Sequence, residues 1–437
     1  MKKNILLTLG FSFFWQAAYS EDKSAVDYIL RKRLEFYNIR PLKNLPLNTN
    51  RPQVELGKRL FSEKKMSGNR RIACLTCHNP KTGTGDAFPM SQTENGKGIL
   101  KRNSPALFNI GMSDKSFMFW DGRVHYDFKN KTFTTPEMAL NGVNPKAKEI
   151  TSALTSALSA QAIFPLVTHN EMLGEKGENE IADAKDNLQA WDRIVVRLKQ
   201  DMSQNSQSKS YSQLFMQAYP NTPIEKINIG HVAESIAAFE REEFQSTGSP
   251  FQRYLKGDNQ AMSHDQKQGL FVFLGNGRCI NCHQGSELGN NNLFASVGAP
   301  QWGEAPLILD KGRGDVVNES KRNFFFRVPS LLNVSLTAPY MHNGAFQTLR
   351  AVINHYDHIS DSLNNFEVSN ERRNTLPVKV AIEKGPLQLD NIWLSSQSGL
   401  TPKLKNRLLL TPIDKDKLEI FLKEALTDSK WSKLKFK

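Results

Sequence analysis

The sequence predicts a mostly α-helical chain of two similar halves, with few or no strands. Apolar residues recur at helical spacing, as Val232, Ile236 and Phe239 do at i, i+4 and i+7, whereas strand patterns are sparse. Two stretches also resemble each other, ELGKRLFSEKKMSGNRRIACLTCH and QKQGLFVFLGNGRCINCH. Each ends in Cys-x-x-Cys-His after a short basic link. This weak internal repeat favours two domains of related construction.

The first twenty residues have the pattern of an export signal. Lys2 and Lys3 precede the apolar run ILLTLGFSFFW, and Ala18-Tyr19-Ser20 forms a small-x-small cleavage site. The alternative is an uncleaved membrane anchor. No later run reaches the ~18 apolar residues that a spanning helix needs. We therefore expect an exported, periplasmic protein with no membrane span in its mature form.

The chain carries a formal net charge of +13. Its basic residues are spread out, with no long Lys/Arg block and no nucleic-acid-binding motif, so a nucleic-acid partner is weakly supported. A basic surface can steer an acidic protein partner, although a solvated surface is the simpler interpretation.

All cysteines of the chain fall into two copies of one pattern, CLTCH and CINCH. In this pattern both thiols can add to the vinyl groups of a haem, and the next residue becomes an axial ligand of the iron. A four-cysteine zinc site usually has ~15–20 residues between its pairs, whereas these pairs lie in opposite halves of the chain. A redox thiol pair would need a βαβ context, which is absent. The motifs therefore predict two covalent c-type haems, bound by Cys74, Cys77 and His78 and by Cys279, Cys282 and His283.

Two further features describe the organisation along the chain. Thr411 and Pro412 are a suitable N-cap and first residue for a C-terminal helix, whose apolar positions are Leu418, Phe421, Leu422, Ala425 and Leu426. The stretch NTPIEKINIGH, residues 221–231, indicates a domain junction. We expect an N-terminal haem domain over residues 21–225 and a C-terminal haem domain over residues 226–437.

A series of motifs runs over nearly the whole chain after the signal: LGKRLF, CLTCH, RNSPALFN, FMFWDGRV, AQAIFPLVTHNEM, HVAESIAAFERE, CINCH, DKGRG, FRVPSLLNVSLTAPYMHNGAFQTLRAVINHYD and EIFLKEAL. In content and order this set resembles one family, the bacterial di-haem cytochrome c peroxidases, including the MauG group. The resemblance implies two facing haem domains, an N-terminal haem that reacts with peroxide and a C-terminal haem that holds or relays electrons. Family members are often homodimers, and nothing in the sequence decides this point.

A peroxidatic haem needs an open coordination position. Some family members close this position with a loop histidine, but the present sequence has no histidine between His78 and His125. We expect the first haem to be five-coordinate or water-bound at rest, as in the MauG group. His125 and His169 remain alternative ligands from more distant segments.

Ile150, Leu154, Leu158 and Gln161 share one helical face, and Pro165 is expected to end that helix. Glu171 follows six residues later. On the residues alone this is a helix end with a solvated glutamate. The resemblance implies instead a distal pocket, in which Glu171 moves protons with a pKa raised by burial and Gln161 holds water or peroxide. The stretch between the tryptophan motif and this pocket, residues 124 to 157, is longer than in the family, and the course of residues 124–149 is open.

Trp120 opens the motif WDGR. On its own it reads as a core tryptophan before a tight turn, whereas the resemblance places it between the haems as a carrier of electrons or holes. Asn103, Thr337 and Pro339 are loop residues by themselves. They resemble the family's interdomain calcium position, where an amide oxygen and two carbonyl oxygens suit a hard cation.

The sixth ligand of the second haem departs from classical peroxidases. In those enzymes a methionine lies fourteen residues after the histidine of PY-x-H, which is His342 here, and that position holds Tyr356 as in the MauG group. Tyr356 also falls on the inward face of the helix predicted after Thr348. His355, Met341 or no ligand are the alternatives. A tyrosinate favours ferric iron and lowers the reduction potential.

These features predict a periplasmic di-haem peroxidase that reduces hydrogen peroxide at the N-terminal haem. Its electrons come from a small c-type cytochrome or another donor protein through the C-terminal haem. The first alternative is a MauG-like enzyme in which a ferryl haem oxidises a partner protein at long range. The second is a non-catalytic electron-transfer cytochrome. The sequence does not name the donor or the partner.

Overall fold

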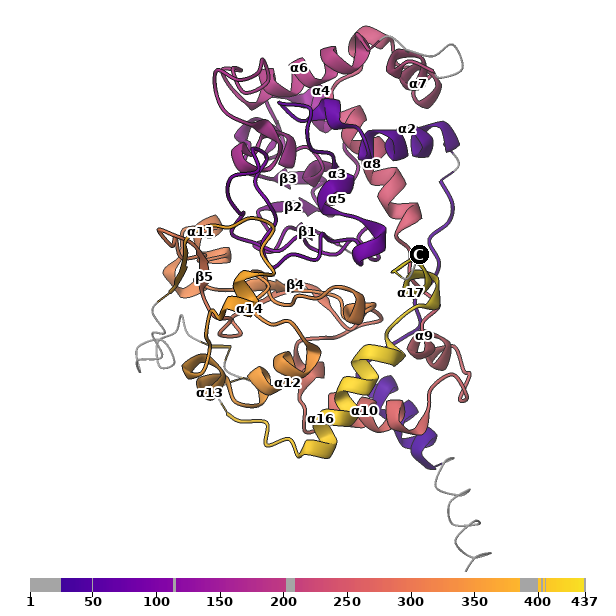
Figure 1. Ribbon diagram of the computed structural model, residues 1–437. Helices are drawn as coiled ribbons and strands as arrows, with labels where there is room; N and C mark the ends of the chain where they lie inside the picture. The colour runs from indigo at the N-terminus through magenta and orange to yellow at the C-terminus, as the bar shows by residue number, and fades with distance from the viewer. Residues whose placement is uncertain are drawn as a thin grey trace, which may run out of the picture.

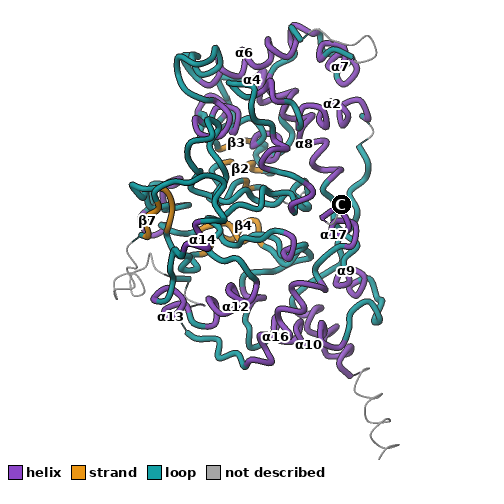
Figure 2. Tube along the Cα trace, in the orientation of Figure 1, coloured by secondary structure: helices purple, strands orange, loops and turns teal. Residues whose placement is uncertain are grey.

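The computed structural model describes residues 25–435 except 49, 113–114, 202–208, 386–399, 402–403 and 405. The predicted export signal, residues 1–20, lies outside this part. The described chain is mostly helical with few short strands, as predicted (Figures 1 and 2). Within it, no helix has both the length and the hydrophobicity needed to cross a membrane.

The longer helices lie toward the upper and lower ends of the molecule, and the strands lie nearer its middle together with several short helices (Figure 2). The first helix of the described chain covers residues 25–36 and has no label in the figures. Helices of the first half are α2 (Arg51–Phe61), α3 (Cys74–Cys77), α4 (Lys148–Thr151), α5 (Ala157–Gln161), α6 (Asn187–Lys199), α7 (Tyr211–Ala218) and α8 (Ile229–Glu243). Those of the second half are α9 (Pro250–Leu255), α10 (His264–Leu274), α11 (Arg313–Val317), α12 (Leu349–Asp357), α13 (Ile359–Asn364), α14 (Asn370–Arg373), α16 (Pro412–Ile420) and α17 (Ser429–Lys435).

Three small antiparallel sheets occur in the described residues, with strand orders β1-β2-β3, β4-β6 and β5-β7. The first sheet explains part of the long segment after Trp120, because β2 and β3 form a hairpin in which Tyr126 pairs with Phe133. The strands are β1 (Phe117–Met118), β2 (Val124–Asp127), β3 (Thr132–Thr134), β4 (Asn290–Ala295), β5 (Trp302–Glu304), β6 (Phe326–Val328) and β7 (Ile382–Lys384).

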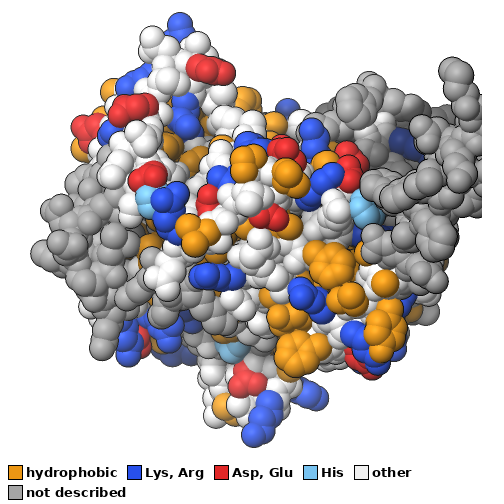
Figure 3. All heavy atoms as spheres, turned by 90° about the horizontal axis from the view of Figure 1, so that it is seen from below, with side chains coloured by type: hydrophobic (Ala, Val, Ile, Leu, Met, Phe, Trp, Pro, Cys, Tyr) orange, Lys and Arg blue, Asp and Glu red, His pale blue; other side chains and the backbone are white. Residues whose placement is uncertain are grey.

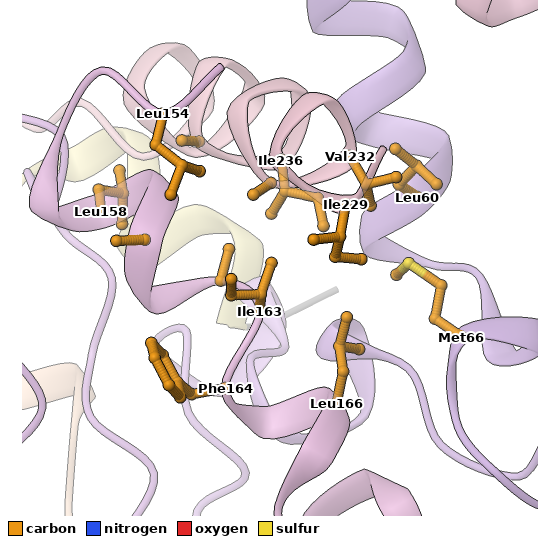
Figure 4. Packing of buried hydrophobic residues seen from close by; sticks show 14 of the residues in the cluster. Leu60, Met66, Leu154, Leu158, Ile163, Phe164, Leu166, Ile229, Val232 and Ile236 are labelled. Carbon is orange, nitrogen blue, oxygen red and sulfur yellow. The ribbon is translucent and has the colours of Figure 1, made fainter. Parts of the chain in front are cut away.

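The first hydrophobic core forms around α8, whose buried residues include Val232 and Ile236. Figure 4 shows Leu60 of α2 beside Val232, with Leu154 and Ile163 on the other side near Ile236. The predicted stripe of α8 is therefore confirmed. The apolar faces of several short helices are buried against this one long helix, which holds the upper part of the molecule together (Figure 1).

The second core is built from residues 251–426 together with residues 30–42. The helix over residues 25–36 lies beside α10 at the lower end of the molecule, far from α2, which follows it in sequence (Figure 1). Helix α16 begins as predicted, with Thr411 as its N-cap and a proline in its first turn. Its apolar face packs on α10.

The two cores bear on where the halves of the chain meet. Helix α8 belongs to the first core, which runs along the chain to Phe244 and also includes Leu336 and Trp431, and the second core resumes at Phe251. Although α8 follows the polar junction at 221–231, it buries its apolar face against α2 and α5. Turn-forming residues therefore mark a loop inside the first half.

The helix expected over residues 150–161 is broken. Helix α4 ends at Thr151, and α5 begins anew at Ala157 with Ser156 as its N-cap. Between them the Thr155 backbone N–H and hydroxyl donate to the Glu234 carboxylate of α8, at 3.1 and 2.9 Å. This competition from side-chain hydrogen bonds interrupts the helical ladder. Pro165 does not end α5, because it begins a 3-10 turn over Pro165–Val167.

Candidate active site

Two cavities lie in the interior, and each contains one Cys-x-x-Cys-His motif. The first is lined by Cys74, Cys77 and His78 and has a volume of about 840 Å³. The second is lined by Cys279, Cys282 and His283. Because the two cysteine pairs open into separate cavities, they cannot share one zinc ion. Within the described residues no group of three or more His, Cys, Asp or Glu side chains is placed to hold a metal ion.

The two histidines are oriented in the same way, which is what an axial haem ligand requires. The Nδ1 atom of His78 lies 3.1 Å from the Thr84 carbonyl oxygen, and Nδ1 of His283 lies 3.1 Å from that of Leu288. Such a bond fixes the ring and leaves Nε2 available to a metal. Burial lowers the pKa of His283 to about 4, so its ring is neutral and able to donate an electron pair. The residues of both motifs therefore fit a haem.

The predicted distal residues meet in the first cavity. Gln161 comes from the end of α5, Pro165 from the following 3-10 turn, and Glu171 from a π-helical turn over His169–Leu173. The Glu171 side chain is partly accessible because it lines the first cavity, and the rest of its surroundings are protein. Burial raises the pKa of its carboxyl, and the positive charges of Arg123 and Arg102 oppose this rise.

Two histidines were expected as alternative ligands for the first haem. His169 lines the first cavity, but its side chain is 53% exposed and its Nε2 atom lies 3.0 Å from Glu175 Oε1. His125 stacks on Phe117 at 4.2 Å, and it lines neither cavity.

Trp120 lies on a wall that both cavities share. Its indole Nε1 donates to the Asn103 carbonyl oxygen at 2.9 Å, and its own carbonyl oxygen accepts from the Arg327 backbone N–H at 2.8 Å. The chain beside it is bound by Arg102, which donates to both Asp121 and Asp310. Asp121 follows Trp120, whereas Asp310 comes from the second half, so this network joins the two halves at the wall.

Tyr356 lines the second cavity from α12, which begins after the N-cap Thr348 as predicted. Burial raises the pKa of its phenol, so it ionises only beside a cation such as ferric iron. Met341 and His342 line the same cavity. His355 is bound elsewhere, with its ring nitrogens 3.0 Å from Ser362 Oγ and 2.8 Å from the Val297 carbonyl oxygen.

The three residues of the predicted calcium position all line the second cavity. Asn103 also lies on the shared wall, where its side-chain Nδ2 donates to the Phe88 carbonyl oxygen at 2.6 Å. Thr337 and Pro339 follow the turn at Val334–Leu336. The structure brings the residues to one cavity, and calcium itself stays a prediction.

Comparison with known proteins gives one consistent result. The family model described as di-haem cytochrome c peroxidase matches residues 51–260. Cytochrome c551 peroxidase of Pseudomonas aeruginosa is 29% identical over 305 residues, which are 69% of this chain and 70% of that protein. The methylamine utilization protein MauG of Methylorubrum extorquens is 27% identical over 333 residues, 74% of this chain and 76% of that protein.

The chain belongs to the di-haem cytochrome c peroxidase/MauG family. It is an oxidoreductase of that family, and haem is the cofactor that the family implies. The fold agrees. The structural alignment with a MauG-like protein associated with microbial copper homeostasis covers 90% of this chain and 94% of that protein. Its TM-score is 0.59 and the sequence identity is 22%. The diheme peroxidase BthA of Burkholderia thailandensis aligns with this chain over 90% of each protein, with a TM-score of 0.57 and 17% sequence identity.

Two buried charged residues of this family member were not predicted as site residues. Glu240 of α8 lines the first cavity, and burial raises the pKa of its carboxyl to about 8. Arg327 of β6 lines both cavities. Both stand inside motifs used for the resemblance, AFERE and FRVP. Their sequence signal is a charged residue next to apolar ones, which does not distinguish a cavity wall from a solvated edge.

Proposed function

We propose that this protein is an exported di-haem c-type peroxidase that reduces hydrogen peroxide at the haem of the first cavity. Two c-type haems, attached through Cys74 and Cys77 and through Cys279 and Cys282, would occupy the two cavities. His78 and His283 would be their axial ligands. The predicted division into two haem domains is kept in this proposal, with its boundary moved to residues 245–250, where the cores change.

The observation that carries this proposal is the composition of the first cavity. One wall supplies His78, and the same cavity is lined by Gln161, Pro165 and Glu171. A side chain able to move a proton thus shares a cavity with the candidate iron ligand, while the loop after His78 supplies no histidine to close the coordination position. An accessible position of this kind favours a reaction with peroxide over simple electron transfer.

The bound haem iron would supply the oxidising chemistry. Glu171 would take a proton from one oxygen of hydrogen peroxide and return it to the other, which makes water the leaving group. Its raised pKa keeps the carboxyl basic enough for the first step. Gln161 has an amide that both donates and accepts, so it would hold peroxide or water beside Glu171.

Electrons would reach the first haem from the second one through Trp120 on the shared wall. Tyr356 is proposed as the sixth ligand of the second haem, since His355 already has a hydrogen-bond partner at each ring nitrogen. A small c-type cytochrome or another donor protein would supply the electrons. Calcium at Asn103, Thr337 and Pro339 would join the two halves of the wall. A homodimer remains a candidate assembly.

Tyr356 also favours a second candidate function. A tyrosinate ligand makes the second haem a poor acceptor of electrons from an ordinary cytochrome, but a suitable place to share oxidising equivalents. In that case the protein would use peroxide to oxidise a side chain of a partner protein at long range, as a MauG-like enzyme. The partner would then be a protein whose side chain is a reluctant electron donor.

The deciding experiment is peroxide-dependent oxidation of a reduced small cytochrome c by the purified two-haem protein. For the peroxidase we expect turnover that is slowed by ~10²–10⁴-fold in Glu171→Gln. Turnover should be retained in Glu175→Gln, because Glu175 is a partly exposed acid on the same loop. Slow turnover with a long-lived oxidised haem spectrum would favour the MauG-like function. Two six-coordinate haems whose spectra do not respond to peroxide would refute both and leave an electron-transfer cytochrome.

A further inference from the structure

Arg327 carries a buried positive charge that has no carboxylate partner among the residues that the structure describes. Among the described residues the buried lysines and arginines are Lys115, Arg197, Lys267 and Arg327. The first three each contact a carboxylate, Glu287, Glu180 and Asp27, at 2.5, 2.5 and 2.8 Å. No ion pair of Arg327 is found in the part of the chain that the structure describes. A buried charge without a counter-ion is costly, so a compensating anion is expected.

The hydrogen bonds of Arg327 do not meet this need. Its Nε donates to the Phe119 carbonyl oxygen at 3.1 Å and its Nη1 to Asn291 Oδ1 at 3.0 Å, and both acceptors are neutral. Burial lowers the pKa of the guanidinium to about 10 despite the more distant charges of Glu287 and Asp121. The residue remains a cation at neutral pH, and its Nη2 has no hydrogen bond to any described residue.

The position of Arg327 indicates where the anion comes from. The shared wall consists of the residues that line both cavities, which are Asn103, Ser104, Pro105, Ala106, Ile110, Trp120 and Arg327. Arg327 is the charged residue of this wall. Strand β6 holds it there through pairing with β4, where Arg327 stands opposite Phe294. None of the described carboxylates that line the cavities forms an ion pair with Arg327, and the two beside the wall, Asp121 and Asp310, are already bound by Arg102. A haem carries two propionate carboxylates.

We propose that Arg327 binds a haem propionate at the wall between the cavities and thereby raises the reduction potential of both haems. The proposal rests on the two haems of the proposed function. A guanidinium and a carboxylate form a strong, directional pair in a dry site. The same positive charge acts on both irons, since it faces both cavities, and it favours the reduced state of each. Arg327 is thus a positioning and tuning residue rather than a catalytic one.

The test is spectroelectrochemical titration of the two-haem protein and its variants. Arg327→Gln is expected to lower the midpoint potentials of both haems, and Arg327→Lys, which keeps the charge, should restore most of the loss. Arg197→Gln is the matched control, because Arg197 is equally buried at 9% but lines neither cavity. It is expected to reduce stability and leave both potentials unchanged.

Unchanged potentials in Arg327→Gln with two haems bound would overturn the inference. If Arg327→Gln does not incorporate both haems, the propionate bending bands in the resonance Raman spectrum of Arg327→Lys decide instead. These bands are expected to shift, because lysine replaces a two-pronged donor by a point charge. Unchanged bands would mean that a solvent anion or no anion faces Arg327. A chain purified without haem would overturn this inference together with the proposed function, whereas a peroxide-inert two-haem chain would leave it standing.

Discussion

Glu171 illustrates how a single residue acquires its chemistry from its surroundings. It lies on a π-helical turn, faces the first cavity and has a pKa raised by burial. The same side chain on a solvated loop would be an ordinary carboxylate. Arg123 and Arg102 oppose this rise, because their positive charges favour the ionised carboxylate.

Replacing Glu171 by Gln should slow the reaction with peroxide by ~10²–10⁴-fold, because the amide cannot accept the proton. In the wild type the rate should fall as the pH drops through the raised pKa, since the ionised carboxylate is the form that accepts a proton. Stopped-flow absorption of the haem bands measures both effects. A rate that does not change in the variant would remove Glu171 from the mechanism.

Replacing Tyr356 by Phe should convert the second haem to a five-coordinate or water-bound species. The ring stays, so packing in the second cavity is preserved, and only the phenol oxygen is lost. The tyrosinate-to-iron charge-transfer band should disappear, and the midpoint potential of the second haem should rise. Absorption and EPR spectra detect the loss of the ligand. His355→Gln is the control, and an effect confined to that variant would point to His355 as the ligand.

At the scale of elements, the contact between α2 and α8 has little spare room. A Cβ atom on Gly57 would lie 1.8 Å from the Ser235 carbonyl oxygen of α8, which requires the two helices to move apart. Gly57→Ala is therefore expected to lower the free energy of unfolding by ~1–3 kcal/mol, as overpacked sites do. Lys58→Ala, on the exposed side of the same helix, should change it little. Denaturant unfolding compares the two, and equal stabilities would contradict this close packing.

At the scale of the whole molecule, His342 ties the two halves together and makes the fold sensitive to acid. Its carbonyl oxygen accepts from the Asn103 backbone N–H at 2.6 Å, and its Nε2 lies 3.9 Å from Asp310 Oδ2. Burial lowers the pKa of its ring from 6.5 to about 4. Below pH 6.5 the unfolded chain binds a proton that the folded chain excludes, so stability falls as the pH drops toward 4. The full loss from this residue is ~3 kcal/mol.

Urea unfolding at several pH values between 7 and 4.5 measures this dependence. His342→Gln should reduce this dependence, because the amide does not titrate, whereas His264→Gln on the exposed side of α10 should not. Part of the dependence should remain in His342→Gln, since burial also lowers the pKa of His283 and His355 to about 4. The same pH slope in both variants would assign the acid sensitivity to other groups. Figure 3 shows charged side chains of both signs scattered over the lower face among apolar ones.

The amino-acid sequence by itself determined the features that depend on local spacing. Two Cys-x-x-Cys-His motifs specify the candidate haem ligands, and periodic apolar residues specify α8 and α16. Tertiary structure decided what depends on neighbours distant in sequence. The helix expected over residues 150–161 is broken beside Glu234, and α8 joins the first core although a polar junction precedes it. Arg327 reads as one basic residue in a short strand, and only the wall around it leaves its charge without a partner. Local spacing is encoded within a few residues, whereas a buried charge is defined by everything that surrounds it.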